Sequence, residues 1–311
     1  MQAWPELPYA ALRPTADTLQ LWTQIVGKVR LARAPWLNHS WHVPLYVSAR
    51  GLATSLIPGD DMSLDMEFDF IAQDLVIRAA DGGERKIPLS AGSVAGVYAQ
   101  VLEALAALGT PTRIDPVPSE MLEATPFDKD TANRPYDPGV ARDFWRALVR
   151  IDAVFTRFRS CFIGKNSPVH FFWGGFDLAV TRFSGRRAPR HPGGIPHLSD
   201  AVTREAYSHE VSSAGFWPGG AGVEEPSFYS YAYPTPQGFA AAKVSPDAAR
   251  FDPGLGEFLL PYEAVRTAAD PGGVLLSFLQ STYAAAADLG GWDRAELECE
   301  EGHPGRPRPV A

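Results

Sequence analysis

The alternation of hydrophobic and polar residues along the chain predicts two series of helices and strands. In the first series, residues 15–33 repeat hydrophobic side chains at helical spacing, whereas residues 63–70 (SLDMEFDF) alternate between hydrophobic and acidic side chains. The first pattern is typical of an amphipathic helix and the second of a half-buried strand. The series also contains a strand at residues 41–51, two strands around an Asp-Gly-Gly turn within residues 74–89, and a helix at residues 90–109.

A second series follows in the same order. Residues 138–163 predict a long helix and residues 272–289 a closing helix, with four strands between them near 168–183, 205–212, 227–233 and 256–261. Gly-Lys occurs towards the end of the first opening helix and directly after the second, and Leu-Gly ends both closing helices. We therefore predict an internal duplication. The fold class is α+β, with two similar halves, each a helix, antiparallel strands and a helix, and with sheets covered by helices.

These patterns also divide the chain. The first half, with an N-terminal arm, spans 1–110, a Pro-rich connector spans 111–137, the second half spans 138–293, and the tail at 294–311 is expected to be disordered. Residues 184–204 and 234–256 are expected to be loops. If the two sheets join, a pocket is expected at the boundary between the halves, because ligand sites favour such boundaries.

Composition and charge exclude several classes of protein. The chain has 311 residues, 45% of them hydrophobic and 21% charged, which is typical of a soluble globular protein. A net charge of -8 argues against a nucleic-acid partner. Hydrophobic segments end before the roughly 18 residues that a membrane helix needs, so no membrane is expected. The N-terminus lacks a secretory pattern, and two cysteines do not make a disulfide framework, so we expect a cytoplasmic protein.

The common catalytic signatures are missing from the sequence. There is no P-loop, GxGxxG, HExxH or GxSxG pattern, so NTPase, nicotinamide, zinc-protease and α/β-hydrolase functions have no local support. No spacing supplies the three or so converging ligands that a metal needs. The cofactor is therefore unknown, and a bound metal stays an open alternative. Cys161, near a helix end, is expected to be inert packing.

The segment SPVHFFWGGFDLAVTRFSGRRAPRHPGG, residues 167–194, carries the least ordinary chemistry. Asp177 lies between hydrophobic residues, so it must be exposed, paired or functional, because burying an unpaired carboxylate is costly. A salt bridge with Arg182 and a role in a site are the two alternatives. The Gly174-Gly175 pair can introduce a bulge that resets the faces of the strand. The arginines that follow suit a carboxylate or phosphate ligand, or simply a solvated loop.

Three other stretches supply further candidates. His42 shares a strand face with Tyr46 and Arg50 and is expected either to line a cavity or to satisfy backbone groups. His209 and Glu210 precede a Gly/Pro/aromatic turn, where a histidine can act as a general base or metal ligand. In FYSYAYPTP, tyrosines at alternate positions provide either ligand contacts or a packed sheet surface.

Several motifs together resemble a family of uncharacterised bacterial proteins, a domain of unknown function. They are SPVHFFWGGFDLAVTRFSGR and YSHEVSSAGFWPG, with WPELPYAAL, NHSWHVPLYVSARGL and FYSYAYPTP. The resemblance runs over nearly the whole chain. It implies no activity, cofactor or catalytic residue.

The leading hypothesis is an enzyme that acts on a small polar or anionic metabolite by His/carboxylate acid–base chemistry in a ligand pocket. A non-catalytic small-molecule-binding or sensory protein and a structural or interaction module are the alternatives. The catalytic candidates are His42, Asp177, His209 and Glu210, and the ligand-binding candidates are Tyr46, Arg50, Trp173, Arg182, Arg186, Trp217, Tyr229 and Tyr231.

Overall fold

The computed structural model describes residues 3–59, 61–220 and 222–308. In these residues, seven α-helices accompany two antiparallel sheets, one of five strands and one of six. The chain is therefore an α+β protein, as the sequence predicts. None of the helices in these ranges combines the length and the hydrophobicity that a membrane span requires.

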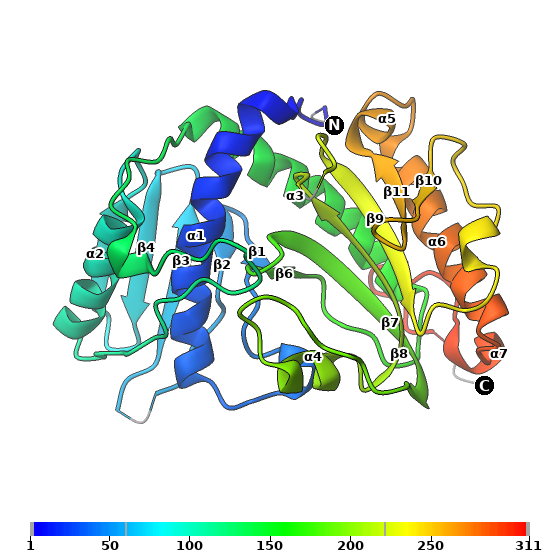
Figure 1. The fold of residues 1–311 in the computed structure, drawn as a ribbon, viewed down its shortest axis with the longest axis horizontal. Coiled ribbons are helices and arrows are strands. Elements are labelled where there is room, and N and C mark those ends of the chain that lie inside the picture. The colour runs from blue at the N-terminus through cyan, green and yellow to red at the C-terminus, as the bar shows by residue number, and fades with distance from the viewer. Residues whose placement is uncertain (1–2, 60, 221, 309–311) are drawn as a thin grey trace.

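The first half contains the five-stranded sheet, whose strands are neighbours in chain order. Its β3 alternates as predicted, so that the hydrophobic side chains of Leu64, Met66 and Phe68 are completely buried. Helix α1 crosses one side of this sheet (Figure 1). The elements are α1 (Tyr9–Arg33), β1 (Tyr46–Val47), β2 (Gly51–Ala53), β3 (Leu64–Asp69), β4 (Asp74–Ala79), β5 (Glu84–Pro88) and α2 (Val94–Ala107).

The second half contains the six-stranded sheet, in the order β10-β11-β9-β8-β7-β6. Helices α3 and α6 run behind it in Figure 1. Both helices begin at the sequence Asp-Pro-Gly, where the Asp side chain accepts backbone N–H bonds and proline occupies the first helical position. The elements are α3 (Pro138–Ser160), β6 (His170–Phe172), β7 (Asp177–Arg187), α4 (Asp200–Ala206), β8 (His209–Trp217), β9 (Ser227–Tyr233), β10 (Arg250–Asp252), β11 (Glu257–Pro261), α5 (Tyr262–Arg266), α6 (Pro271–Leu289) and α7 (Arg294–Leu297).

The two sheets meet at the first strand of each half. Leu45, just before β1, and Phe171, in β6, exchange two backbone hydrogen bonds of 2.9 and 2.7 Å. Each half contains an opening helix, an antiparallel sheet and a closing helix, in that order, but in the second sheet β9 pairs with β11 and β10 lies at the edge. Whether this arrangement arose by duplication stays a prediction.

The six-stranded sheet has one face on its helices and one face that is free of them. On β7, Leu178, Val180 and Arg182 point to the helical side, and Asp177, Ala179 and Thr181 point to the other side. His170 pairs with Ala179 across the two strands and therefore shares the free face. The turn at Gly174-Gly175 separates β6 from β7, so side-chain alternation does not continue from one strand to the next. The sequence analysis left such an interruption open beside a continuous strand.

Several boundaries differ from the sequence expectation. Helix α1 starts at Tyr9, six residues early, and contains Pro14. The strand expected at 205–212 starts only at His209, because α4 ends at Ala206. Residues 294–308 of the tail include α7 and a bridge between Phe162 and Glu298; residues 309–311 lie outside the described part of the chain.

Candidate functional site

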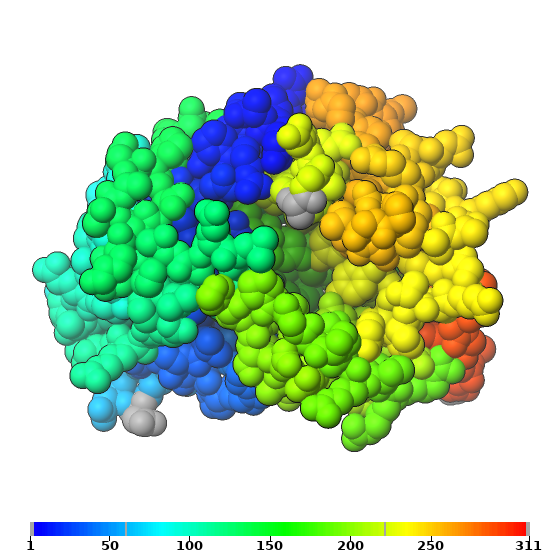
Figure 2. All heavy atoms as spheres, viewed as in Figure 1, coloured from blue at the N-terminus to red at the C-terminus, as the bar shows by residue number. Residues whose placement is uncertain are grey.

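A cavity of about 290 Å³ lies over the free face of the six-stranded sheet, at the boundary between the halves. The surface is hollowed over this sheet in Figure 2. One wall comes from the end of α1 and the 3₁₀ turn η1 (Asn38–Ser40), and the lid comes from α4 and the segment before it. Most of its large side chains are aromatic, including Trp36, Trp41, Phe172, Trp173, Phe183 and Tyr207.

Asp177, the first residue of β7, provides a carboxylate inside this cavity. The Tyr229 hydroxyl, from β9, donates a hydrogen bond to Asp177 Oδ2. The Tyr229 ring crosses β8 at Gly215, where an added Cβ would lie only 2.3 Å from the hydroxyl oxygen. Burial raises the pKa of Asp177 to about 6, although the Tyr229 bond acts in the opposite direction.

Glu120 provides a second carboxylate, which the sequence analysis did not identify. It comes from the Pro-rich connector and has a left-handed backbone, with φ of 62°. Its carboxylate lies against Gly174, where an added Cβ would be 2.0 Å from Glu120 Oε1. The enclosing protein and the negative charge of Asp177 raise the pKa of Glu120 to about 7. Although protein surrounds the carboxylate, the side chain is exposed to the cavity, so a ligand can reach it.

The backbone before Glu120 is fixed from α1. Gln24 Nε2 donates to the Ser119 carbonyl at 3.0 Å, and the Ser119 N–H donates to Gln24 Oε1 at 2.7 Å. Both residues are buried. The Glu120 N–H donates to the carbonyl of Pro196 in the lid segment at 2.9 Å. A helix of the first half and a loop of the second half thus hold this carboxylate in place.

The electrostatic character of the cavity is acidic. Glu120 and Asp177 line it, and Glu257, at the start of β11 and outside the lining, has a pKa raised to about 7 by burial and then by Asp177 and Asp252. Among the described residues that line the cavity, none is Lys or Arg. A ligand that enters this cavity meets the carboxylates of Glu120 and Asp177, while Lys165 lies against the lining residues His39 and Phe183 without being part of the lining itself.

Hydroxyl groups form a band beside the carboxylates. The hydroxyls of Tyr207 and Tyr231 lie 2.8 Å apart, and those of Thr181 and Ser213 also lie 2.8 Å apart. All four residues line the cavity. Because each hydroxyl can donate or accept, this band suits a ligand with several polar groups.

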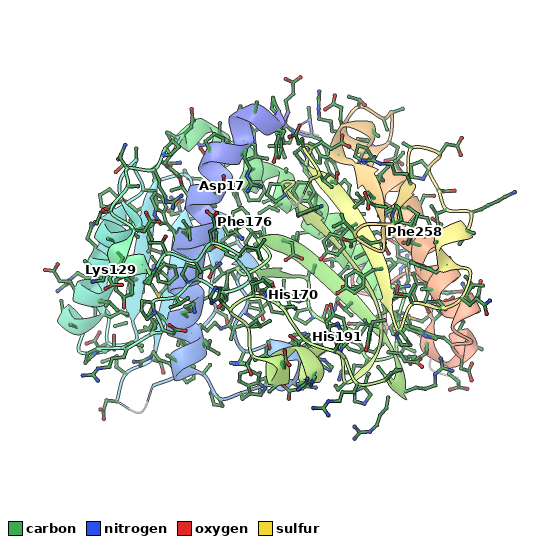
Figure 3. The ribbon with its side chains drawn as sticks, viewed as in Figure 1. Asp17, Lys129, His170, Phe176, His191 and Phe258 are labelled. Atoms are coloured by element: carbon green, nitrogen blue, oxygen red, sulfur yellow. The ribbon has the colours of Figure 1, made fainter. Side chains whose placement is uncertain are left out.

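His170 lines the cavity as a neutral imidazole. Its Nδ1 lies 2.7 Å from the Pro168 carbonyl, and burial lowers its pKa to about 4. In Figure 3, His170 lies near the centre of the molecule and His191 lies near α4. His191 stacks on Tyr207 with ring centroids 4.7 Å apart, behind the hydroxyl band.

Helix α4 is fastened to η1 at the side of the cavity. His39 Nδ1 lies 2.9 Å from the Ala206 carbonyl, and Lys165 Nζ lies 2.6 Å from His39 Nε2. Since a lysine ammonium only donates, His39 accepts at Nε2 and donates from Nδ1. Trp36 Nε1 also donates to Glu205 of α4. These bonds hold the lid onto the first half.

The structure brings together only some of the residues that the sequence singled out. Asp177, Trp173, Tyr229 and Tyr231 line the cavity. The other three catalytic candidates do not. His42 accepts the Leu37 N–H at 3.2 Å, which matches the local backbone role that the sequence left open.

The remaining candidates lie elsewhere. Arg182 is on the helical face, where its guanidinium stacks 3.5 Å from the Phe158 ring centroid, so neither a salt bridge with Asp177 nor a ligand contact in the cavity is formed. Arg186 pairs with Glu210 at 2.6 Å, beside the end of α6. Four more candidates lie outside the cavity lining. Arg50 pairs with Asp69, and the Tyr46 ring centroid lies 5.4 Å from the Arg30 guanidinium. Trp217 is the last residue of β8, and the ring of His209 lies 6.3 Å from that of His39.

Among the described residues, no group of three or more His, Cys, Asp or Glu side chains is arranged to hold a metal ion. Comparisons with curated proteins and with solved structures gave no match. Residues 4–299 match the model of a family of unknown function, DUF5996, and the chain therefore belongs to this family, as the resemblance of its motifs indicates.

Proposed function

We propose that the protein is an enzyme that moves a proton on a small polar molecule, with Glu120 and Asp177 as its acid–base pair. One observation carries the proposal: the two carboxylates share one cavity, and their pKa values of about 7 and about 6 lie close to neutral pH. Proton transfer by a side chain is most efficient when its pKa is near the working pH.

The surroundings of the two carboxylates suggest different roles. Asp177 has the lower pKa and a fixed hydrogen bond from Tyr229, so it acts as the base. Glu120 keeps its proton to higher pH and is open to the cavity, so it acts as the acid. The hydroxyls of Tyr207 and Tyr231 orient polar groups of the ligand, and the aromatic walls limit access of water.

The charge of the cavity favours a cationic or neutral ligand over the anionic one considered from the sequence. Carboxylates and aromatic faces both attract ammonium groups, and an anion would find no Lys or Arg among the described lining residues. We therefore propose a small amine-bearing molecule as the substrate. A cytoplasmic location stays a prediction.

The proposal is tested by incubating the protein with a bacterial metabolite extract and following depletion and product formation by mass spectrometry. Wild-type protein should convert an amine-bearing compound catalytically, whereas Glu120→Gln and Asp177→Asn should lower the rate at least a hundredfold, the range for an acid–base group. Asp65→Asn, a surface carboxylate paired with Arg78, is the matched control and should keep full activity. Equal conversion by all four proteins would refute the assignment.

A non-catalytic amine-binding protein is the second candidate, because the aromatic walls of the cavity suit cation binding without chemistry. It predicts a compound that is retained in one-to-one amount and released unchanged. Tryptophan fluorescence reports such binding, since Trp36, Trp41 and Trp173 line the cavity. Titration with small ammonium compounds and with carboxylates of equal size should give a signal only for the ammonium compounds.

A further inference from the structure

The two cysteines of the chain, Cys161 and Cys299, face each other across a pair of backbone segments. Cys161 follows the last residue of α3, and Cys299 follows α7. A lone cysteine near a helix end predicts inert packing for Cys161, but in the folded chain Cys299, 138 positions later, lies beside it.

The backbone register makes the two cysteines direct partners. Phe162 and Glu298 form an antiparallel bridge, the Ile163 N–H donates to the Leu297 carbonyl at 2.8 Å, and the Cys299 N–H donates to the Cys161 carbonyl at 3.2 Å. Cys161 and Cys299 are the next pair in this register and share this one bond, because the Cys161 N–H donates to the Phe158 carbonyl at 3.2 Å. Directly opposed residues of this kind have Cα atoms about 5.5 Å apart. This separation falls within the range of roughly 4.4–6.8 Å that a disulfide spans.

The sulfur atoms lie over the same helical turn. Cys161 Sγ is 3.5 Å from the Arg157 carbonyl, and Cys299 Sγ is 3.5 Å from the Ser160 carbonyl. Both side chains are half-buried, so a small reagent has access. Burial raises the pKa of the Cys161 thiol, and the neighbouring Cys299 sulfur acts in the same direction as a smaller contribution.

Cys299 is the better placed of the two for nucleophilic attack. The Arg308 guanidinium contacts Cys299 Sγ, whereas Cys161 Sγ lies against the Arg157 carbonyl. Burial raises the pKa of Cys161, so this thiol stays protonated more often. The first attack on an oxidant therefore belongs to Cys299, and Cys161 acts as the second, resolving thiol.

We propose that Cys161 and Cys299 form a reversible disulfide that fastens residues 293–308 to the end of α3. The Cys299 thiolate attacks a small-molecule disulfide such as oxidised glutathione and releases one glutathione thiol. Cys161 then loses its proton, attacks the Cys299 sulfur and releases the second glutathione thiol. The two cysteines lose two electrons and two protons, which reduce one glutathione disulfide to two thiols.

The full-length protein should be incubated with oxidised glutathione, alkylated with N-ethylmaleimide and measured by intact and peptide mass spectrometry. The reduced protein should take up two labels, and the oxidised monomer should take up none and yield a linked Cys161–Cys299 peptide. Cys161→Ser should accumulate the mixed disulfide on Cys299. Two labels after oxidation, two bound glutathiones on the wild-type chain, or links only between chains would overturn the proposal.

A stability measurement tests whether the disulfide stabilises the folded protein or forms without any effect on stability. A disulfide that closes a long loop restricts the unfolded chain, so oxidised wild-type protein should unfold several degrees above the reduced protein. The double variant Cys161→Ser/Cys299→Ser should unfold at one temperature under both conditions. An oxidised wild-type protein that unfolds at or below the reduced one would contradict a fastening role.

Discussion

Asp177→Asn should make the protein more stable at pH 8, although it removes a charge from a hydrogen-bonded residue. Burial raises the pKa of this carboxyl from 3.8 to about 6 in the folded protein. Between these values the folded state binds a proton that the unfolded chain has already lost. The free energy of unfolding therefore falls as the pH rises through this window, and the penalty is complete above pH 6.

The magnitude follows from the shift. Roughly two pKa units at about 1.4 kcal/mol each give an upper bound of about 3 kcal/mol. Part of the Asp177 side chain faces the cavity, so solvent screening reduces the expected gain to about 1–2 kcal/mol. Asparagine keeps an oxygen that accepts the Tyr229 hydroxyl bond, and its neutral side chain also removes the charge that raises the pKa of Glu120.

Urea unfolding followed by tryptophan fluorescence, repeated between pH 5 and pH 8, measures this effect. Wild-type stability should rise as the pH falls from 7 to 5, and the slope should be shallower in Asp177→Asn. The control Asp65→Asn should lose up to about 1 kcal/mol at pH 8, because it removes an exposed ion pair with Arg78. An Asp177→Asn protein that is less stable than wild type at pH 8, or that keeps the wild-type slope, would refute the electrostatic argument.

Three further substitutions probe how the cavity is built. Gly215→Ala places a Cβ against the Tyr229 hydroxyl and should cost about 1–3 kcal/mol in urea unfolding, with a rise in the pKa of Asp177 visible by NMR titration. Gly27→Ala places a Cβ 2.1 Å from Trp173 Nε1 and should lower the free energy of unfolding by about 2–4 kcal/mol. It should also shift tryptophan emission to the red, and unchanged emission would contradict the contact. His39→Asn, which tolerates the left-handed backbone at φ 57°, should loosen α4 and speed its cleavage by trypsin at least several-fold; equal cleavage rates would exclude a fastening role.

Sequence periodicity predicted the strands in which hydrophobic side chains alternate with polar ones, even though Glu67 and Asp69 on the polar face of β3 are also buried. The alternation in residues 63–70 matches β3, and residues 227–233 coincide with β9. It failed at 205–212, because α4 is a single short helix whose N-cap, Ser199, lies in a loop-like composition. Periodicity also predicted too long a first strand. Before β1 the chain is paired only through the backbone hydrogen bonds between Leu45 and Phe171, and side-chain alternation does not reveal these bonds.

Local chemistry predicted part of the site. Asp177 stands out in the sequence because a carboxylate among hydrophobic residues must have a specific role, and the structure places it in the cavity. His42 and Glu210 looked equally reactive, yet His42 Nδ1 accepts the backbone N–H of Leu37 and Glu210 pairs with Arg186, both outside the cavity lining. Glu120 carried no signal, because its Pro-rich segment has no periodicity and its position depends on Gln24, 96 residues earlier.

Three glycines help to form the site, and patterns of hydrophobic and polar residues do not predict their role. Gly27 leaves room for the indole of Trp173, Gly174 leaves room for the carboxylate of Glu120, and Gly215 leaves room for the ring of Tyr229. Two of them are also ordinary in sequence terms, one within a helix and one within a strand, where glycine weakens the element. Close approach of another group is the physical reason to tolerate that cost. A glycine inside a predicted element therefore points to a packed neighbour, and here it points to the walls of the cavity.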